Sequence, residues 1–314
     1  MNTRINLFLV LAAAFVVILG AYTRLTHSGL GCPDWPGCYG QLIVPSDVPH
    51  DPSFTASKAW AEMIHRYAAG LLGLGIIAWA LYQWRVSQRA HPELLIMCIL
   101  VVVQAAFGAF TVTWKLHPLA VMPHLIGGIT LTCLLWYHYL KGPTDHMDRR
   151  FRLIWGIAFA CLIIQCICGG WTSANYAALI CPDFPSCQGI HFPNIHFDLA
   201  TDLQLPIGLN HEGGRLSMAA RVSIHMLHRY MGLITGIVCM LFFIKTWLDT
   251  AHKQIKKALL IAGATLIAQA TFGFLNIYWI LPLSVATAHN GMALASLLAF
   301  IYLYHQVRIY HEHH

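Results

Sequence analysis

The chain contains little charge. Only 10% of its 314 residues are charged, whereas 57% are hydrophobic and the mean hydropathy is +0.59. A water-soluble domain of this length needs far more charge on its surface, so the composition excludes one and indicates a membrane protein with several spans. Nothing in the net charge of +6 indicates a nucleic-acid surface, and membrane lipid is its expected contact.

Apolar stretches long enough to cross a bilayer recur along the chain. A span takes about 20 mostly apolar residues. Eight stretches qualify, at roughly 6–24, 62–84, 93–114, 119–140, 151–172, 222–247, 257–279 and 283–305. No small-residue cleavage site follows the first stretch, so we expect a retained helix there rather than a signal peptide. The sequence therefore predicts an all-α membrane protein with eight transmembrane helices.

Lysine and arginine predict the orientation of these helices in the cell membrane. With the N-terminus inside, the cytoplasmic side holds 12 of the 19 basic residues, although the two long loops lie on the other side. The twelve are Arg4, Arg85, Arg89, Lys141, Arg149, Arg150, Arg152, Lys245, Lys253, Lys256, Lys257 and Arg308. By the positive-inside rule, both termini are expected to be cytoplasmic.

The second half of the chain repeats the first. The cysteine motif 32–38 returns at 181–187, at an offset of 149, and His124 returns as His289 at an offset of 165. His65 returns as His228 at an offset of 163, so the second outer loop is 14 residues longer. Four helices in each half, an even number, predict one shared topology about a pseudo-two-fold axis along the membrane normal. We expect two four-helix bundles, residues 1–142 and 143–314.

Four of the repeated residues are histidines near the outer end of a span, namely His65, His124, His228 and His289. At ~1.5 Å per residue they lie roughly 5–10 Å inside the apolar region, where ionisable side chains are costly and usually face the bundle interior. One such histidine would more often bond a neighbouring helix. Four in two matched pairs favour two haem irons, each with two axial imidazoles. Other outer histidines, among them His117 and His211, match no partner at the repeat spacing.

Glu62 marks a difference between the halves, because His225 stands at its position in the second copy. A carboxylate three residues before His65 lies on the same helix face. It could accept a proton or stabilise a cationic intermediate. It could equally be an acidic residue favoured by the dipole at a helix N-terminus, and the spacing alone does not decide.

Two further repeated pairs are polar. Arg66 and Arg229 follow the first histidine of each half, and we expect them to pair with haem propionates in preference to lipid headgroups. Gln104 and Gln269 lie in the middle of spans, where an amide is expected to bond helix to helix.

The cysteines fall into two groups. Four form the pairs Cys32 with Cys38 and Cys181 with Cys187, on the oxidising side of the membrane, whereas six lie in apolar spans. The location favours a disulfide in each pair, and no ligand at short spacing supports a metal site. A structural staple is the simpler interpretation. A redox role for the first pair stays open, because a small exposed loop can exchange with an external thiol carrier.

Together these features resemble haem A synthase, a membrane enzyme of cytochrome oxidase assembly. The resemblance covers nearly the whole chain and rests on the eight-helix duplication and both loop cysteine pairs. It also rests on Glu62-x-x-His65-Arg66, His124, His228-Arg229 and His289.

The resemblance implies oxidation of a methyl group of haem O to a formyl group by two successive hydroxylations. It implies that the first half holds this substrate, with Glu62, His65 and His124 as catalytic residues. The second half would hold a permanent haem b on His228 and His289, which relays electrons. Its partners would be haem O, the enzyme that produces haem O, and an electron donor that the sequence does not identify. The sequence leaves open whether a second copy of the chain is a further partner.

Two axial histidines leave the iron of the substrate without an open position for oxygen. Either one ligand leaves, or electrons are removed from the porphyrin edge and water supplies the oxygen. Glu62 stabilising positive charge is consistent with the second route.

Two other classes of function remain compatible with parts of the pattern. A transmembrane electron-transfer cytochrome also uses paired histidines, but it has no need for a glutamate in one half only. A quinone-linked thiol oxidoreductase would use the cysteine pairs for catalysis and would not need His124.

Overall fold

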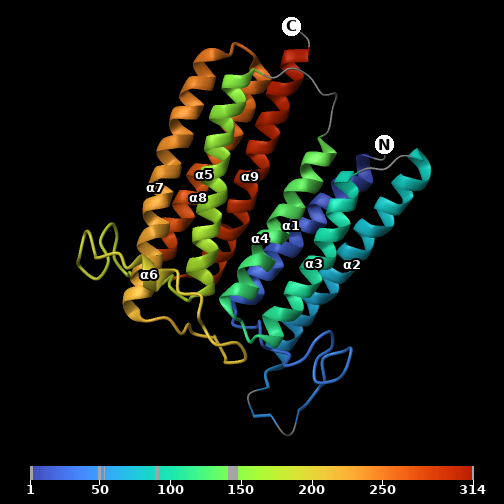
Figure 1. Ribbon diagram of the computed structural model, residues 1–314, viewed down its shortest axis with the longest axis vertical. Helices are drawn as coiled ribbons and strands as arrows, with labels where there is room; N and C mark the ends of the chain where they lie inside the picture. The colour runs from blue at the N-terminus through green and yellow to red at the C-terminus, as the bar shows by residue number, and fades with distance from the viewer. Residues whose placement is uncertain (1–2, 49–50, 53, 89–91, 141–147, 313–314) are drawn as a thin grey trace. The chain divides into compact units, whose positions relative to one another are not determined.

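The computed structural model describes residues 3–48, 51–52, 54–88, 92–140 and 148–312, and the regular secondary structure in these ranges is helical (Figure 1). The helices are α1 (Thr3–Leu25), α2 (Ala56–Ser87), α3 (Pro92–Thr113), α4 (Pro118–Tyr139), α5 (Arg149–Ala174), α6 (Phe197–Ala200), α7 (Met218–Asp249), α8 (Lys253–Tyr278) and α9 (Leu283–Glu312). The expected all-α fold is confirmed. The sequence did not predict α6, a single turn within the second long loop.

Eight of these helices are long and apolar enough to cross a membrane, which confirms the eight expected spans. Their outward side chains are large and apolar. Leu71 and Leu74 on α2, for example, are 72% and 68% exposed. Such a surface is stable in lipid rather than in water, so the chain is a multi-pass membrane protein.

Local signals in the sequence set where several helices begin. Pro92 and Pro118 are the first residues of α3 and α4, positions at which proline lacks only an N–H that would be unpaired anyway. Asp148 caps α5 by accepting the N–H groups of Arg150 and Phe151, and Ser217 caps α7 by accepting that of Ala220.

The described helices form two compact units. The first contains residues up to Leu135 together with 202–215, and the second contains 136–201 and the chain from Leu216 onward. In the second unit α5 packs on α7 and α9, and α8 packs on α7 and α9, which closes a four-helix bundle. In the first unit α2 packs on α1 and α3. The boundary expected between residues 142 and 143 lies outside the described residues, as do Arg89 and Lys141.

The segment 202–215, from the longer second loop, belongs to the first unit and is anchored there by two histidines. The rings of His117 and His211 lie 4.7 Å apart between centroids. The backbone N–H of His211 donates to the carbonyl of Lys115 at 3.0 Å, and Nε2 of His117 donates to that of Leu205 at 3.0 Å. Burial lowers the pKa of His211, which keeps its imidazole neutral. The insertion in the second half therefore completes the first unit.

The two cysteine motifs fold in the same way. Disulfides join Cys32 to Cys38 and Cys181 to Cys187, which confirms both expected bridges. In each loop an aspartate accepts two backbone N–H groups: Asp34 from Tyr39 and Gly40, and Asp183 from Gln188 and Gly189. The Ser186 hydroxyl and these N–H groups lower the pKa of Asp183 to about 2, so it remains an ionised acceptor.

Each of the four repeated histidines lies against a glycine of a neighbouring helix in its own unit. A Cβ atom added at the glycine would lie 2.9–3.3 Å from Cε1 of the imidazole, closer than the 3.5–4.0 Å of an optimal carbon contact. The pairs are Gly20 on α1 with His65 on α2, Gly108 on α3 with His124 on α4, Gly169 on α5 with His228 on α7, and Gly273 on α8 with His289 on α9. The missing side chain of each glycine provides the space for one imidazole.

We predict that Gly169→Ala displaces the His228 ring and lowers the midpoint of thermal unfolding in detergent. The added methyl group would lie 3.0 Å from the ring, and overpacking of this kind costs about 1–3 kcal/mol. The control is Gly156→Ala in the same helix, where an added Cβ meets no atom within 4 Å and helix propensity alone favours alanine. Equal midpoints for the two variants would contradict this account.

Candidate functional site

The first unit brings His65 and His124 together. Their rings lie on α2 and α4, with 6.3 Å between centroids and an interplanar angle of 88°. Nitrogen–metal bonds to imidazole are about 2 Å long, so two imidazoles on opposite sides of one metal atom have centroids roughly 6 Å apart. The spacing of this pair fits a single metal atom between the two rings.

The donor set of the pair suits haem iron better than a bare ion. Among the described residues, no group of three or more histidine, cysteine, aspartate or glutamate side chains could hold a metal. Two imidazoles do not fill the coordination sphere of a metal, so another ligand has to occupy the remaining positions. A porphyrin does this, because it supplies four nitrogens in one plane. The residues present therefore fit a haem with two axial histidines.

The second unit places His228 of α7 and His289 of α9 among glutamines. Nε2 of Gln165, on α5, lies 3.1 Å from Nδ1 of His228. Nδ1 of His289 donates to the backbone carbonyl of Gln269 at 3.1 Å, which leaves a lone pair on its Nε2. The Gln269 amide lies 3.3 Å from that Nε2 and would move aside for a metal. In this unit, Nδ1 of each imidazole therefore has a hydrogen-bond partner.

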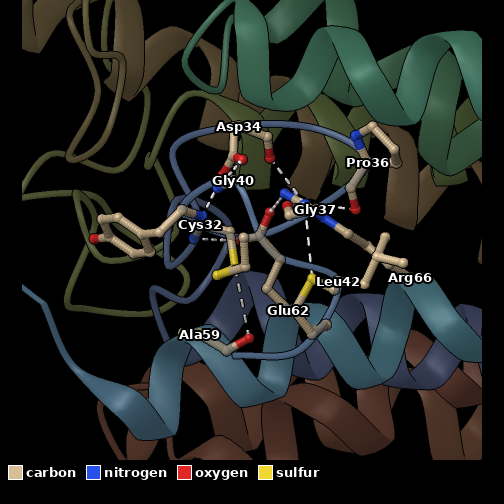
Figure 2. Close-up of a disulfide and its surroundings, with 12 residues drawn as sticks. Cys32, Asp34, Pro36, Gly37, Gly40, Leu42, Ala59, Glu62 and Arg66 are labelled. Atoms are coloured by element: carbon tan, nitrogen blue, oxygen red, sulfur yellow. Dashed lines mark hydrogen bonds and ion pairs between the residues drawn. A yellow bond between two sulfur atoms is a disulfide. The ribbon is translucent and has the colours of Figure 1, made fainter. Parts of the chain in front are cut away.

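Glu62 is buried and turned toward the first disulfide loop (Figure 2). One carboxylate oxygen accepts the backbone N–H of Cys32 at 2.8 Å, and the other forms an ion pair with Arg66 one turn along α2. Helix α2 begins at Ala56 and has no acidic residue in its first turn. The interpretation of Glu62 as an N-terminal residue favoured by the helix dipole is therefore wrong, because the helix starts earlier than expected.

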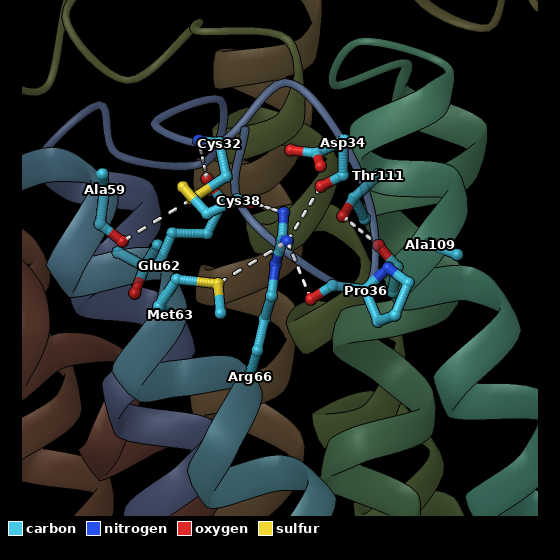
Figure 3. A network of polar contacts seen from close by, with 12 residues as sticks. Cys32, Asp34, Pro36, Cys38, Ala59, Glu62, Met63, Arg66, Ala109 and Thr111 are labelled. Carbon is cyan, nitrogen blue, oxygen red and sulfur yellow. Dashed lines mark hydrogen bonds and ion pairs between the residues drawn. A yellow bond between two sulfur atoms is a disulfide. The ribbon is translucent and has the colours of Figure 1, made fainter. Parts of the chain in front are cut away.

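Arg66 fastens the same loop to α2 (Figure 3). Its guanidinium donates to the backbone carbonyls of Asp34 at 2.8 Å, Pro36 at 3.3 Å and Gly37, besides pairing with Glu62. Nη1 donates to the loop carbonyls and Nη2 to Glu62, so both terminal nitrogens of the planar guanidinium are used. The pairing of Arg66 with a propionate stays a prediction, and the contacts that the structure shows are with the loop and Glu62.

The second unit uses a different pair for the same purpose. Arg229 donates to the carbonyls of Ser186 at 2.7 Å and Cys181 at 2.9 Å. His225, at the position of Glu62, donates from Nδ1 to the carbonyl of Ala177 at 2.8 Å. Both loops are therefore clamped by an arginine, but the carboxylate is found in the first unit only.

Both disulfides are buried beneath these clamps. Cys32 and Cys38 are 0% exposed, and Cys181 and Cys187 are 1% exposed. The loop itself is exposed, as expected, for example at Trp35 and Leu42, but its two sulfur atoms are not, because Glu62 and Arg66 hold the cysteines against the start of α2. An external thiol could reach the sulfur atoms only after the loop had opened.

Comparison with known proteins agrees with this arrangement. A family model described as COX15-CtaA, cytochrome oxidase assembly protein, matches residues 3–301. A protein of Shewanella oneidensis named "Heme A synthase" is 37% identical over 304 residues, covering 91% of this chain and 90% of its own. A protein of the same name from Neorickettsia sennetsu is 26% identical over 310 residues, covering 88% and 90%. One from Bacillus cereus is 26% identical over 187 residues, covering 55% and 57%. The chain belongs to the COX15-CtaA family of cytochrome oxidase assembly proteins.

Proposed function

We propose that this protein is a haem A synthase, a membrane oxidoreductase that converts a methyl group of haem O to a formyl group. The observation that carries the proposal is a pair of facing imidazoles, His65 and His124, in a unit that also contains the buried Glu62. The family and the names of the relatives agree with it.

The first repeat, residues 1–142, holds the substrate. His65 and His124 bind the haem O iron from opposite faces and fix the macrocycle between α2 and α4. The Gly20 and Gly108 contacts hold the two rings in place. The segment 202–215, anchored through His211, completes this unit from the second loop.

Glu62 acts next to this substrate position. Its carboxylate has hydrogen bonds to the backbone N–H groups of Cys32 and Gly31 and an ion pair with Arg66, which use three of the about four acceptor sites that two oxygens offer. The remaining lone pair can accept a hydrogen bond or a proton while these partners keep the group in place. A fixed carboxylate also stabilises positive charge that develops nearby. The second repeat, with His225 at this position, lacks this group.

The second repeat, residues 143–314, holds a permanent haem b on His228 and His289. When bound, this haem supplies one-electron transfer to or from the first half. Gly169 and Gly273 provide the space for its two ligands. A separate molecule, which the sequence does not identify, donates the electrons. The enzyme that produces haem O supplies the substrate. The protein lies in the cell membrane with both termini cytoplasmic and both sites toward the outer face.

Expression in cells that make haem O but not haem A tests the proposal directly. We expect haem A, or a hydroxylated haem O on the way to it, when haems are extracted and analysed by mass. A folded, haem-containing protein that leaves haem O unchanged would refute the enzyme assignment and favour an electron-transfer cytochrome.

Two variants separate the roles of the halves in the same cells. Glu62→Ala should retain bound haem and lose conversion by about tenfold or more, because it removes a group that acts on the reaction. His289→Ala should lose the b-type absorption spectrum. If the Glu62→Ala variant converted haem O at the wild-type rate, Glu62 would have no role in the reaction.

The buried disulfides argue against a thiol oxidoreductase, and the arginine clamp gives a test. Arg66→Ala should expose the Cys32–Cys38 bridge to a water-soluble reductant, because three carbonyl contacts of the loop are lost. We expect labelling of the two thiols to become at least about tenfold faster than in wild type. Arg85→Ala, at the other end of α2, is the control. Rapid reduction of the wild-type bridge would restore the thiol mechanism.

A further inference from the structure

The matched imidazoles of His65 and His228 differ at the nitrogen Nδ1. In the first unit, Nδ1 of His65 is buried and has no hydrogen-bond partner among the described residues, whereas His124 interacts with the backbone of Gln104 as His289 does with that of Gln269. In the second unit, Nδ1 of His228 lies 3.1 Å from the Gln165 amide, and Nδ1 of His289 donates to the Gln269 carbonyl. The repeat therefore preserves all four histidines but not the side-chain partner of the first one in each half.

The contact on His228 depends on two residues that change together between the halves. Gln165 lies in the space left by Gly232, one turn beyond His228 on α7: a Cβ added there would lie 3.1 Å from the amide nitrogen. At the repeat offset of 149, Gln165 corresponds to Val16, and at the offset of 163, Gly232 corresponds to Ala69. The first half therefore lacks both the amide and the space for it.

The second histidine of each unit keeps a backbone hydrogen bond to the mid-helix glutamine in both halves, and only the place of the glutamine side chain differs. The side chain of Gln104 packs over Gly127, where an added Cβ would lie 1.8 Å from its amide nitrogen. That nitrogen donates to the carbonyl of Pro123 rather than to an imidazole. At the offset of 165, Met292 stands where Gly127 does. The matching amide, that of Gln269, lies beside His289.

A partner on Nδ1 has a known effect on a metal-binding imidazole. It selects the tautomer that leaves Nε2 free for the metal and fixes the ring orientation, and its loss typically costs 10–100-fold in metal affinity. The Oε1 atom of Gln165 is buried without a partner. Turning the amide by half a turn brings this oxygen to the place of the nitrogen, where it accepts Nδ1–H from His228.

We propose that Gln165, in the space left by Gly232, is a positioning residue that makes the second half retain its haem. In the same way, Val16 and Ala69 leave Nδ1 of His65 without a hydrogen-bond partner, so that the first half releases its haem. This inference rests on the proposed function, and it adds a physical reason why one of two similar sites keeps its haem and the other exchanges it. Gln165 acts through His228 and does not contact the metal position itself.

The test measures haem loss from each half to an excess of a haem-scavenging apoprotein. The second half is studied in the full chain carrying His65→Ala and His124→Ala, and the first in the chain carrying His228→Ala and His289→Ala. In the former background, Gln165→Val should accelerate haem loss about tenfold or more and shift the highest g value of the low-spin haem in electron paramagnetic resonance. Gln165→Glu, which keeps an acceptor for Nδ1–H, should retain haem as wild type does.

The reciprocal substitutions, which give the first half the glutamine and glycine of the second, are made in the chain carrying His228→Ala and His289→Ala. Val16→Gln with Ala69→Gly should slow haem loss from the first half about tenfold. Gln104→Val is the matched control, because it removes a mid-helix amide that bonds to Pro123 rather than to a ring, and it should change the rate by less than about twofold.

Three outcomes would overturn the inference. Gln165→Val could lose haem no faster than its parent, Gln165→Glu could lose it as fast as Gln165→Val, or the Val16→Gln exchange could leave the first half unchanged. A wild-type chain that binds no haem at all would instead overturn the proposed function together with the inference. The two failures are therefore distinguishable.

Discussion

The close contact between an imidazole and a glycine is the interaction on which the rest of this structure depends. It occurs four times, each time between adjacent helices of one unit. A histidine inside an apolar bundle needs a polar or metal partner, because lipid offers it none. Seating the ring on a glycine lets the helices approach and keeps the ring between them. The facing pair His65 and His124 results from two such contacts.

The same scaffold is then modified to give the two units different chemistry. Arg66 and Arg229 clamp equivalent disulfide loops, but the residue one turn earlier is Glu62 in one unit and His225 in the other. Around the ligands, Gln165 with Gly232 stands where the first half has Val16 with Ala69. The two halves thus share one scaffold, and a few polar residues distinguish the site that we propose for the reaction from the site that we propose for retention.

Much of this organisation could be predicted from the sequence. Hydropathy and length identified eight helices, because a bilayer imposes both. The expected location of the cysteine motifs, on the oxidising side, predicted the two bridges, and the repeat offsets selected four of the nineteen histidines. These features depend on local composition or on internal comparison.

Other features required the packed structure. The role of Glu62 depends on α2 starting at Ala56 and on where the loop returns to Cys32. The docking of segment 202–215 depends on His117 and His211, which are far apart in the chain and have no repeat partner. The repeat singled out Gln104 and Gln269 but not Gln165, which has valine at the equivalent position of the first half and whose importance depends on its contact with His228. In each case the contact joins helices or loops whose pairing the sequence does not specify.

Electron paramagnetic resonance of the oxidised protein, purified from cells that make haem O, tests the central claim most directly. Two bis-imidazole haems held in separate units predict two low-spin signals with different highest g values. His65→Ala should remove only the signal of the first unit, and His228→Ala only that of the second. A single low-spin signal that either substitution abolishes would contradict the account, because it would mean that both halves contribute ligands to one haem.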